Sequence, residues 1–203
     1  MIERDPLDYG WWLVSRSAGI VALVAVTLSV VLGLLMANGL PRRRGMKGKL
    51  LRAHEALALA GLFAIGVHGV TLLGSRFLHA SVADLAIPFT LSYRPAFTGT
   101  GILAGYLAAV LGLSFYVRKR VGAKLWRKLH RWTVAVWALG VVHTLGAGTD
   151  ATSAWLRVIM LGGAVPIAVL FARRMLPSAA PAKPGDARPA AGAEQGLASA
   201  PTR

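Results

Sequence analysis

The chain has 203 residues, of which 55% are hydrophobic, and it contains no cysteine. The absence of cysteine excludes disulfide bonds, iron–sulfur ligation by thiolates and thiolate zinc sites. The formal net charge is +15, but the basic residues lie in short segments between apolar blocks. This pattern is typical of membrane proteins, so we expect a lipid bilayer and no nucleic acid as the partner.

The N-terminal residues 1–10 are acidic and lack the basic region of a signal peptide. Apolar blocks of 18 or more residues follow, which is the length needed to cross a hydrocarbon core about 30 Å thick. The sequence therefore predicts an all-α integral membrane bundle with five transmembrane helices. The five spans are expected over residues 11–37, 50–74, 98–117, 128–147 and 154–172.

The loops between these spans differ in charge. Segments 41–52 and 118–131 are rich in arginine and lysine, whereas the loop after span two has only Arg76 and Arg94, and the loop after span four only Arg157. Basic loops face the cytoplasm in membrane proteins. The pattern predicts a multi-pass protein of the plasma membrane with its N-terminus outside and its C-terminus inside.

The C-terminal residues 174–203 are rich in alanine, proline and glycine and have almost no large apolar side chains. Such a segment cannot bury enough surface to fold, so we expect a disordered cytoplasmic tail. The predicted organisation is a short N-terminal segment (1–10), a membrane domain (11–173) and this tail. No glycine-rich nucleotide motif occurs, so we expect no flavin or nicotinamide site in this chain.

Four of the five histidines lie in two of the spans: His54 and His68 in the second, His130 and His143 in the fourth. Ionisable residues inside a membrane are costly and usually mark function. At 1.5 Å per residue the first two are about 21 Å apart along the helix and the second two about 19.5 Å. Because both spans enter from the same side, His54 and His130 share one depth, and His68 and His143 another. Two facing neutral imidazoles suit a six-coordinate b-type haem iron.

Other metal sites match this pattern less well. Zinc and copper sites need three or four clustered ligands, and a proton relay would favour acidic residues, of which only Glu55 is available. One difficulty concerns the helix faces. Fourteen residues leave His54 and His68 about 40° apart around their helix, whereas thirteen leave His130 and His143 about 140° apart. Span four must be tightened or bent, or must present its histidines around the edges of the haems.

Arg16 is the other charge inside a span, at about the depth of the outer histidine pair. A haem propionate is one natural partner for it, and snorkelling to the headgroups is the other possibility. His79 is expected to be a solvated loop residue. Glycines on spans two, three and four either leave room for a flat macrocycle or simply let the helices pack closely.

The two histidine pairs carry a family resemblance. H-x13-H on one span and H-x12-H on the next but one, flanked by basic loops, resemble the ferric reductase-like transmembrane domain over residues 10–173. That family includes ferric reductases, NADPH oxidases and the haem subunit of the bacterial methionine sulfoxide reductase system. The resemblance implies two haem b groups, an inner one bound by His54 and His130 and an outer one bound by His68 and His143. It also favours Arg16 as a haem-contacting residue.

Two departures from the family bear on function. Many members have a sixth span, and the reductases and oxidases carry a flavin and nicotinamide module that this sequence does not show. The leading hypothesis is a dihaem b-type cytochrome, the electron-transfer membrane component of an oxidoreductase. Its donor would be a separate flavoprotein or quinol, and its acceptor an extracytoplasmic redox protein or ferric iron. The alternatives are a ferric reductase with a separate flavin subunit, and a non-redox scaffold or transporter with structural histidines.

Overall fold

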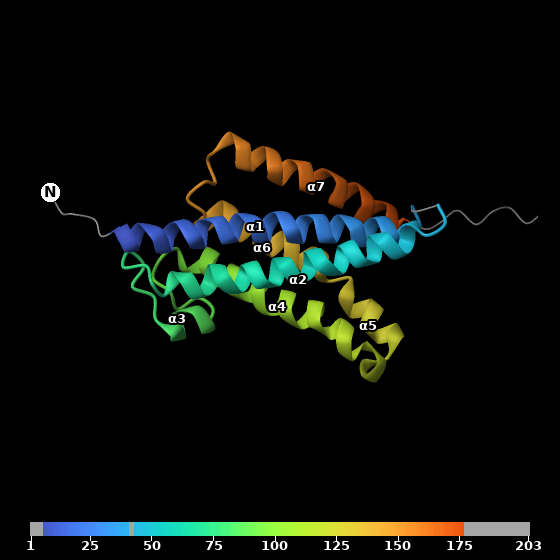
Figure 1. The fold of residues 1–203 in the computed structure, drawn as a ribbon, viewed down its shortest axis with the longest axis horizontal. Coiled ribbons are helices and arrows are strands. Elements are labelled where there is room, and N and C mark those ends of the chain that lie inside the picture. The colour runs from blue at the N-terminus through green and yellow to red at the C-terminus, as the bar shows by residue number, and fades with distance from the viewer. Residues whose placement is uncertain (1–5, 41–42, 177–203) are drawn as a thin grey trace, which may run out of the picture.

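The computed structural model describes residues 6–40 and 43–176. Most of the predicted C-terminal tail and half of the acidic N-terminal segment therefore lie outside the described residues. Within them the secondary structure is entirely helical (Figure 1). The helices are α1 (Pro6–Ala37), α2 (Met46–Leu72), α3 (Val82–Ala86), α4 (Pro95–Val121), α5 (Ala123–His130), α6 (Thr133–Ala147) and α7 (Ala154–Met175).

Four of the described helices, α1, α2, α4 and α7, are long and apolar enough to cross a membrane. The prediction of an all-α membrane bundle is confirmed to this extent. The predicted fourth span, residues 128–147, is divided, because α5 ends at His130 and α6 begins at Thr133. With 15 residues, α6 alone is about 22 Å long, which is less than a hydrocarbon core of about 30 Å. The count of five spans stays a prediction.

The helices are arranged as two hairpins. α1 packs along α2, α4 packs along α6, and α7 packs on the side of α1 (Figure 1). Contact between the two hairpins is much more limited and runs mainly through α1 with α6 and α2 with α4. Because the hairpins touch at few points, side chains that face inward from α2 and α6 lie across from each other with space between them.

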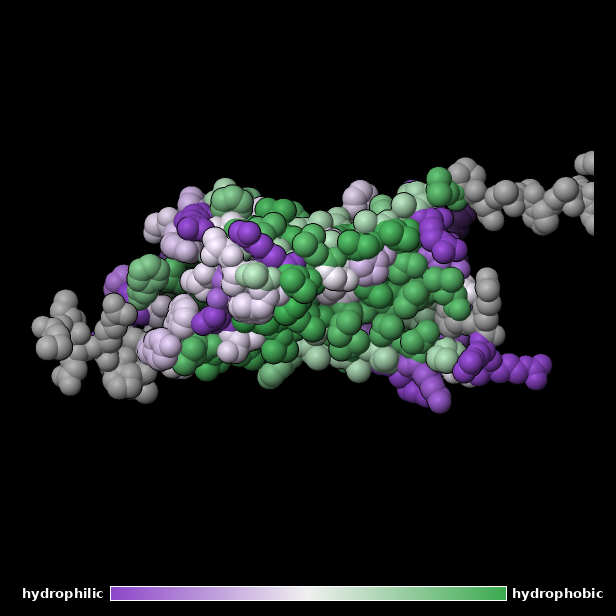
Figure 2. Space-filling view, turned by 90° about the horizontal axis from the view of Figure 1, so that it is seen from above, coloured by the Kyte–Doolittle hydropathy of each residue, from purple (hydrophilic) through white to green (hydrophobic). Residues whose placement is uncertain are grey.

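Burial in this bundle is inverted relative to a water-soluble protein. One small apolar core lies between α1 and α7, where Val30 and Leu34 pack against Ile167 and Leu170. Large apolar side chains in the middle of the long helices instead point outward; Phe63 of α2, for example, is 75% exposed. Figure 2 shows the resulting apolar surface around the middle of the molecule. A surface of this kind indicates a lipid bilayer environment.

Basic side chains gather at one end of the bundle, which we call the basic end; strongly hydrophilic side chains project from this end in Figure 2. The α1–α2 loop, the end of α4, α5 and the end of α7 meet there, and Arg174 of α7 donates a hydrogen bond to the Ala37 carbonyl of α1. The opposite end, called the distal end, holds the α2–α4 loop and the α6–α7 loop. The described basic-end residues are Arg43, Arg44, Lys47, Lys49, Arg52, Arg118, Lys119, Arg120, Lys124, Arg127, Lys128, Arg131, Arg173 and Arg174.

The α2–α4 loop, residues 73–94, is held in an unusual conformation. His79, Phe89 and Arg94 all have positive φ angles, which non-glycine residues adopt only where the surroundings impose them. The Phe89 ring packs directly over the backbone of Gly99, and Arg94 donates a hydrogen bond to the carbonyl of Gly146 at the end of α6. The loop is thus fastened to both helices of the second hairpin.

Within this loop, α3 begins with a capping box between Ser81 and Asp84. The Asp84 backbone N–H donates to the Ser81 hydroxyl, and both the hydroxyl and the backbone N–H of Ser81 donate to the Asp84 carboxylate. These hydrogen bonds hold the pKa of Asp84 below its ordinary value. The short helix is therefore defined by its own cap.

Thr27 of α1 contacts both α6 and α7. Its hydroxyl accepts from the Trp137 indole and donates to the Leu23 carbonyl, and a Cβ on Gly163 would clash with its methyl group. Gly163→Ala should cost about 1–3 kcal/mol, because this threonine cannot move aside. Thermal unfolding in detergent would show the loss.

The neighbouring glycine is a matched control. A Cβ at Gly162 would meet no atom within 4 Å, so Gly162→Ala should not lower the unfolding temperature, and the better helix propensity of alanine favours a small rise. Equal effects of the two substitutions would contradict the packing described for α7.

Candidate functional site

The break between α5 and α6 decides how the histidines are presented. A continuous helix would place His130 and His143 on different faces, but a turn at Arg131 and Trp132 interrupts the helix, although both residues keep right-handed helical backbone angles. The structure brings the four imidazoles together as two pairs: His54 with His130, and His68 with His143. In each pair the ring centroids are 6.1 Å apart. We call them the basal pair, at the basic end, and the distal pair.

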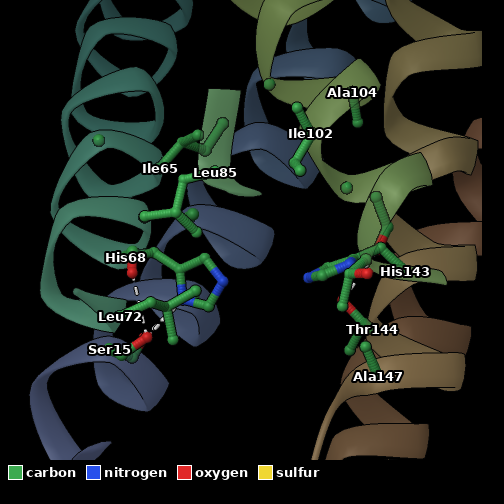
Figure 3. A pocket seen from close by; sticks show the side chains of 18 of the residues that line it. Ser15, Ile65, His68, Leu72, Leu85, Ile102, Ala104, His143, Thr144 and Ala147 are labelled. Carbon is green, nitrogen blue, oxygen red and sulfur yellow. Dashed lines mark hydrogen bonds between the residues drawn. The ribbon is translucent and has the colours of Figure 1, made fainter. Parts of the chain in front are cut away.

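Hydrogen bonds define the protonation of the distal pair. The Nδ1 atom of His68 lies 2.8 Å from the carbonyl oxygen of Ser15, and that of His143 lies 2.9 Å from the carbonyl oxygen of Phe97. A carbonyl oxygen only accepts hydrogen bonds, so both Nδ1 atoms carry the proton in the neutral rings. Nε2 is then left with a free lone pair in each ring. Figure 3 shows the two rings facing each other across the pocket.

The basal pair is arranged differently on its two sides. Nδ1 of His54 lies 2.8 Å from the carbonyl oxygen of Ser29, which repeats the arrangement at His68. Nδ1 of His130 is buried and makes no hydrogen bond within the described residues. The His130 ring is instead stacked on the Trp126 indole, with 4.8 Å between the ring centroids.

Two serines of α1 make a second contact to the backbone of α2. The Ser15 hydroxyl donates to the His68 carbonyl at 3.1 Å, and the Ser29 hydroxyl donates to the His54 carbonyl at 3.2 Å. Both serines are buried. Each histidine on α2 is therefore held by a reciprocal pair of hydrogen bonds to one residue of α1.

Glycines leave the space that these imidazoles occupy. A Cβ on Gly19 would lie 3.1 Å from Nδ1 of His68, and a Cβ on Gly33 would lie 3.2 Å from Cε1 of His54. The sequence reasoning missed both serines and both glycines. The signal for them is S-x3-G, which occurs twice in α1 fourteen residues apart, with the same interval as His54 and His68.

Each histidine pair lies in a cavity between the hairpins. The distal pair contributes to a cavity of about 920 Å³, whose lining is mostly aliphatic side chains and glycines from α1, α2, α4 and α6. The basal pair contributes to a second cavity of about 380 Å³. The basal cavity is also lined by Lys124, Arg127, Arg131 and Arg174, so the two sites differ in charge.

The ring spacing can be compared with that of a metal held between two imidazoles. Two rings bound on opposite sides of one ion, at a metal–nitrogen distance of about 2.0–2.1 Å, would have centroids about 6.3 Å apart. Both observed distances are 6.1 Å. With Nδ1 protonated, Nε2 is the nitrogen free to ligate, which is the usual division of roles in metal-binding histidines. The residues present therefore suit a group that needs two axial imidazoles.

Arg16 lines the distal cavity, but its charge already has a partner. The guanidinium forms a bidentate ion pair with Asp150, with Nε 2.5 Å from Oδ2 and Nη2 2.6 Å from Oδ1. The same group lies over the Trp12 ring, 5.0 Å from its centroid. Asp150 was not identified from the sequence, although it is one of only eight acidic residues in the chain.

The remaining candidate, His79, is exposed in the α2–α4 loop and lines neither cavity. Across the described part of the chain, no three or more histidine or acidic side chains come together in a way that could hold a metal ion. The imidazoles occur as two separate pairs. Comparison of the chain with protein-family models, with curated proteins and with solved structures gives no match.

The ion pair between Arg16 and Asp150 should contribute to stability. Arg16 and Asp150 join the beginning of α1 to the α6–α7 loop, and their side chains are 33% and 17% exposed. Arg16→Gln and Asp150→Asn should each lower stability by about 1–2 kcal/mol, because each leaves a partly buried charge without its partner. The double substitution should cost less than the sum of the two, which a double-mutant cycle in detergent would measure. Strict additivity would contradict the pairing.

Proposed function

We propose that the protein is a dihaem b-type membrane cytochrome. The observation that carries the proposal is the presence of two imidazole pairs, each with ring centroids 6.1 Å apart and each in its own cavity. Two b-type haems would supply one-electron transfer between the two faces of the membrane. His54 and His130 would hold the inner haem, and His68 and His143 the outer haem.

The surrounding residues support this role. Carbonyl groups of Ser15, Ser29 and Phe97 fix three of the four rings with Nε2 unprotonated. The aliphatic lining of the distal cavity would exclude water from a bound macrocycle. At the basal cavity the cationic side chains would neutralise propionate groups. At the distal end Arg16 would share its guanidinium between Asp150 and such a carboxylate.

The orientation and partners follow from the same proposal. The positive-inside rule places the basic end in the cytoplasm and the α2–α4 loop outside. A donor at the basic end would be a separate flavoprotein, whose acidic face would complement the basic residues, or a membrane quinol. The acceptor would be an extracytoplasmic redox protein or ferric iron, as in a ferric reductase with a separate flavin subunit. The resemblance to the ferric reductase-like transmembrane domain supports this assignment.

Haem content is the direct test. The protein purified in detergent should contain two b-type haems per chain in a pyridine haemochrome assay. His68→Ala and His143→Ala should each reduce this to about one, because a six-coordinate site loses an axial ligand. His79→Ala is the matched control and should retain two. Protein without haem would instead support a scaffold or transporter with structural histidines.

The orientation can be tested by labelling, since the chain has no native cysteine. Val82→Cys in α3 and Thr152→Cys in the α6–α7 loop should react with a membrane-impermeant maleimide in intact cells. Lys124→Cys in α5 should react only after the membrane is permeabilised. Because Thr152 and Lys124 flank α6, this result would also require the α5–α6 segment to cross the membrane. Labelling of all three in intact cells would contradict the topology.

A further inference from the structure

The interval of fourteen residues found in α1 occurs again in α4. The carbonyl of Phe97 accepts the hydrogen bond from His143. Leu111 is fourteen residues further along, and its backbone lies beside the His130 imidazole. The two helices that flank the imidazoles, α1 and α4, therefore each present a backbone carbonyl at both depths. At Leu111 this contact does not reach hydrogen-bonding geometry.

The residue four positions after the carbonyl differs in the same way. One helical turn later on the same face, the three carbonyls that accept a hydrogen bond are each followed by glycine. The pairs are Ser15 with Gly19, Ser29 with Gly33, and Phe97 with Gly101. A Cβ at any of these glycines would crowd the imidazole, and at Gly101 it would clash directly with the His143 ring. At the fourth position the residue is Phe115.

Phe115 is part of an aromatic cluster that includes Trp126 and His130. Its ring lies 6.0 Å from the Trp126 ring, centroid to centroid, and Trp126 is stacked on His130. The Trp126 indole N–H donates to the Ser114 hydroxyl at 3.1 Å, which ties α5 to α4. The His130 ring is therefore stacked on Trp126 with no hydrogen bond at Nδ1, whereas His54, His68 and His143 are held by hydrogen bonds to carbonyls.

We propose that His130 is the weakest-held of the four axial ligands, and that an external ligand enters the basal site by displacing it. The inference rests on the proposed function. A hydrogen bond from Nδ1–H to a carbonyl fixes the ring and raises the basicity of Nε2, and loss of such a partner typically weakens a metal site 10–100-fold. The ligand class is a small neutral molecule that binds ferrous iron, for which carbon monoxide serves as the probe.

The test titrates carbon monoxide into the reduced full-length protein and follows the haem absorption bands. The double variant His68→Ala with His143→Ala keeps only the basal pair, and His54→Ala with His130→Ala keeps only the distal pair. Carbon monoxide should half-saturate the basal site at a concentration at least about tenfold lower than the distal site. Equal or reversed affinities would overturn the inference.

Two substitutions at one position isolate the cause in the otherwise unchanged chain. Phe115→Gly removes both the ring and the Cβ, which lets His130 reach the Leu111 carbonyl, whereas Phe115→Ala removes the ring and keeps the Cβ. Only Phe115→Gly should weaken carbon monoxide binding at the basal site, by about tenfold. It should also lower the midpoint potential of that haem, because a more basic imidazole stabilises the oxidised iron. Identical behaviour of the two variants would overturn the inference.

The reverse change is available at the distal site. Gly101→Ala places a Cβ where Phe115 has one, so it should raise the affinity of the distal site for carbon monoxide. The haemochrome assay on each variant distinguishes failure of the proposed function from failure of this inference. Protein without haem would end the proposed function and this inference together. Two haems per chain with no preference for the basal site would end the inference alone.

Discussion

The hydrogen bond from Nδ1–H of a buried imidazole to a carbonyl on the neighbouring helix is the interaction on which this bundle depends. A backbone carbonyl inside a helix is already engaged, so a side chain can share it only where the two helices approach closely. Glycines such as Gly19 and Gly33 permit that approach. Because α1 makes this contact with α2 at two places fourteen residues apart, the relative position of the two helices is fixed. A shift by one residue would break both contacts.

The same interaction explains why the hairpins are separate units. Three of the four imidazoles are hydrogen-bonded within their own hairpin, His54 and His68 of α2 to α1 and His143 of α6 to α4, so their Nε2 atoms are left free for the space between the hairpins. Apolar packing is concentrated between α1 and α7, where Ile167 is nearly fully buried. Side chains consequently leave space between the hairpins, and the two cavities lie there. In a bilayer this costs little, since apolar side chains gain nothing extra by leaving lipid for the protein interior.

Charge is distributed along the axis of the bundle in a way that separates the two cavities. The basal cavity contains four cationic side chains, while the distal cavity contains Arg16 neutralised by Asp150. Under the proposed function, both differences, in charge and in the hydrogen bonding of His130, would act in the same direction on the potential of a bound haem. Net positive charge and a less basic ligand each favour the reduced state. The two sites therefore share one repeated contact, an imidazole Nδ1–H to a carbonyl of α1. They differ in net charge and in the hydrogen bonding of the second histidine.

The sequence by itself determined the long apolar helices, the concentration of basic residues in particular loops and the pairing of the histidines by depth. These follow from length, composition and helical rise, which are local properties of the chain. The tertiary structure decided where the α5–α6 segment breaks, which carbonyl each imidazole meets, and that Asp150 is the partner of Arg16. Those features depend on contacts between residues far apart in the chain, such as Ser15 with His68. Periodicity along one helix contains no information about the helix that packs beside it.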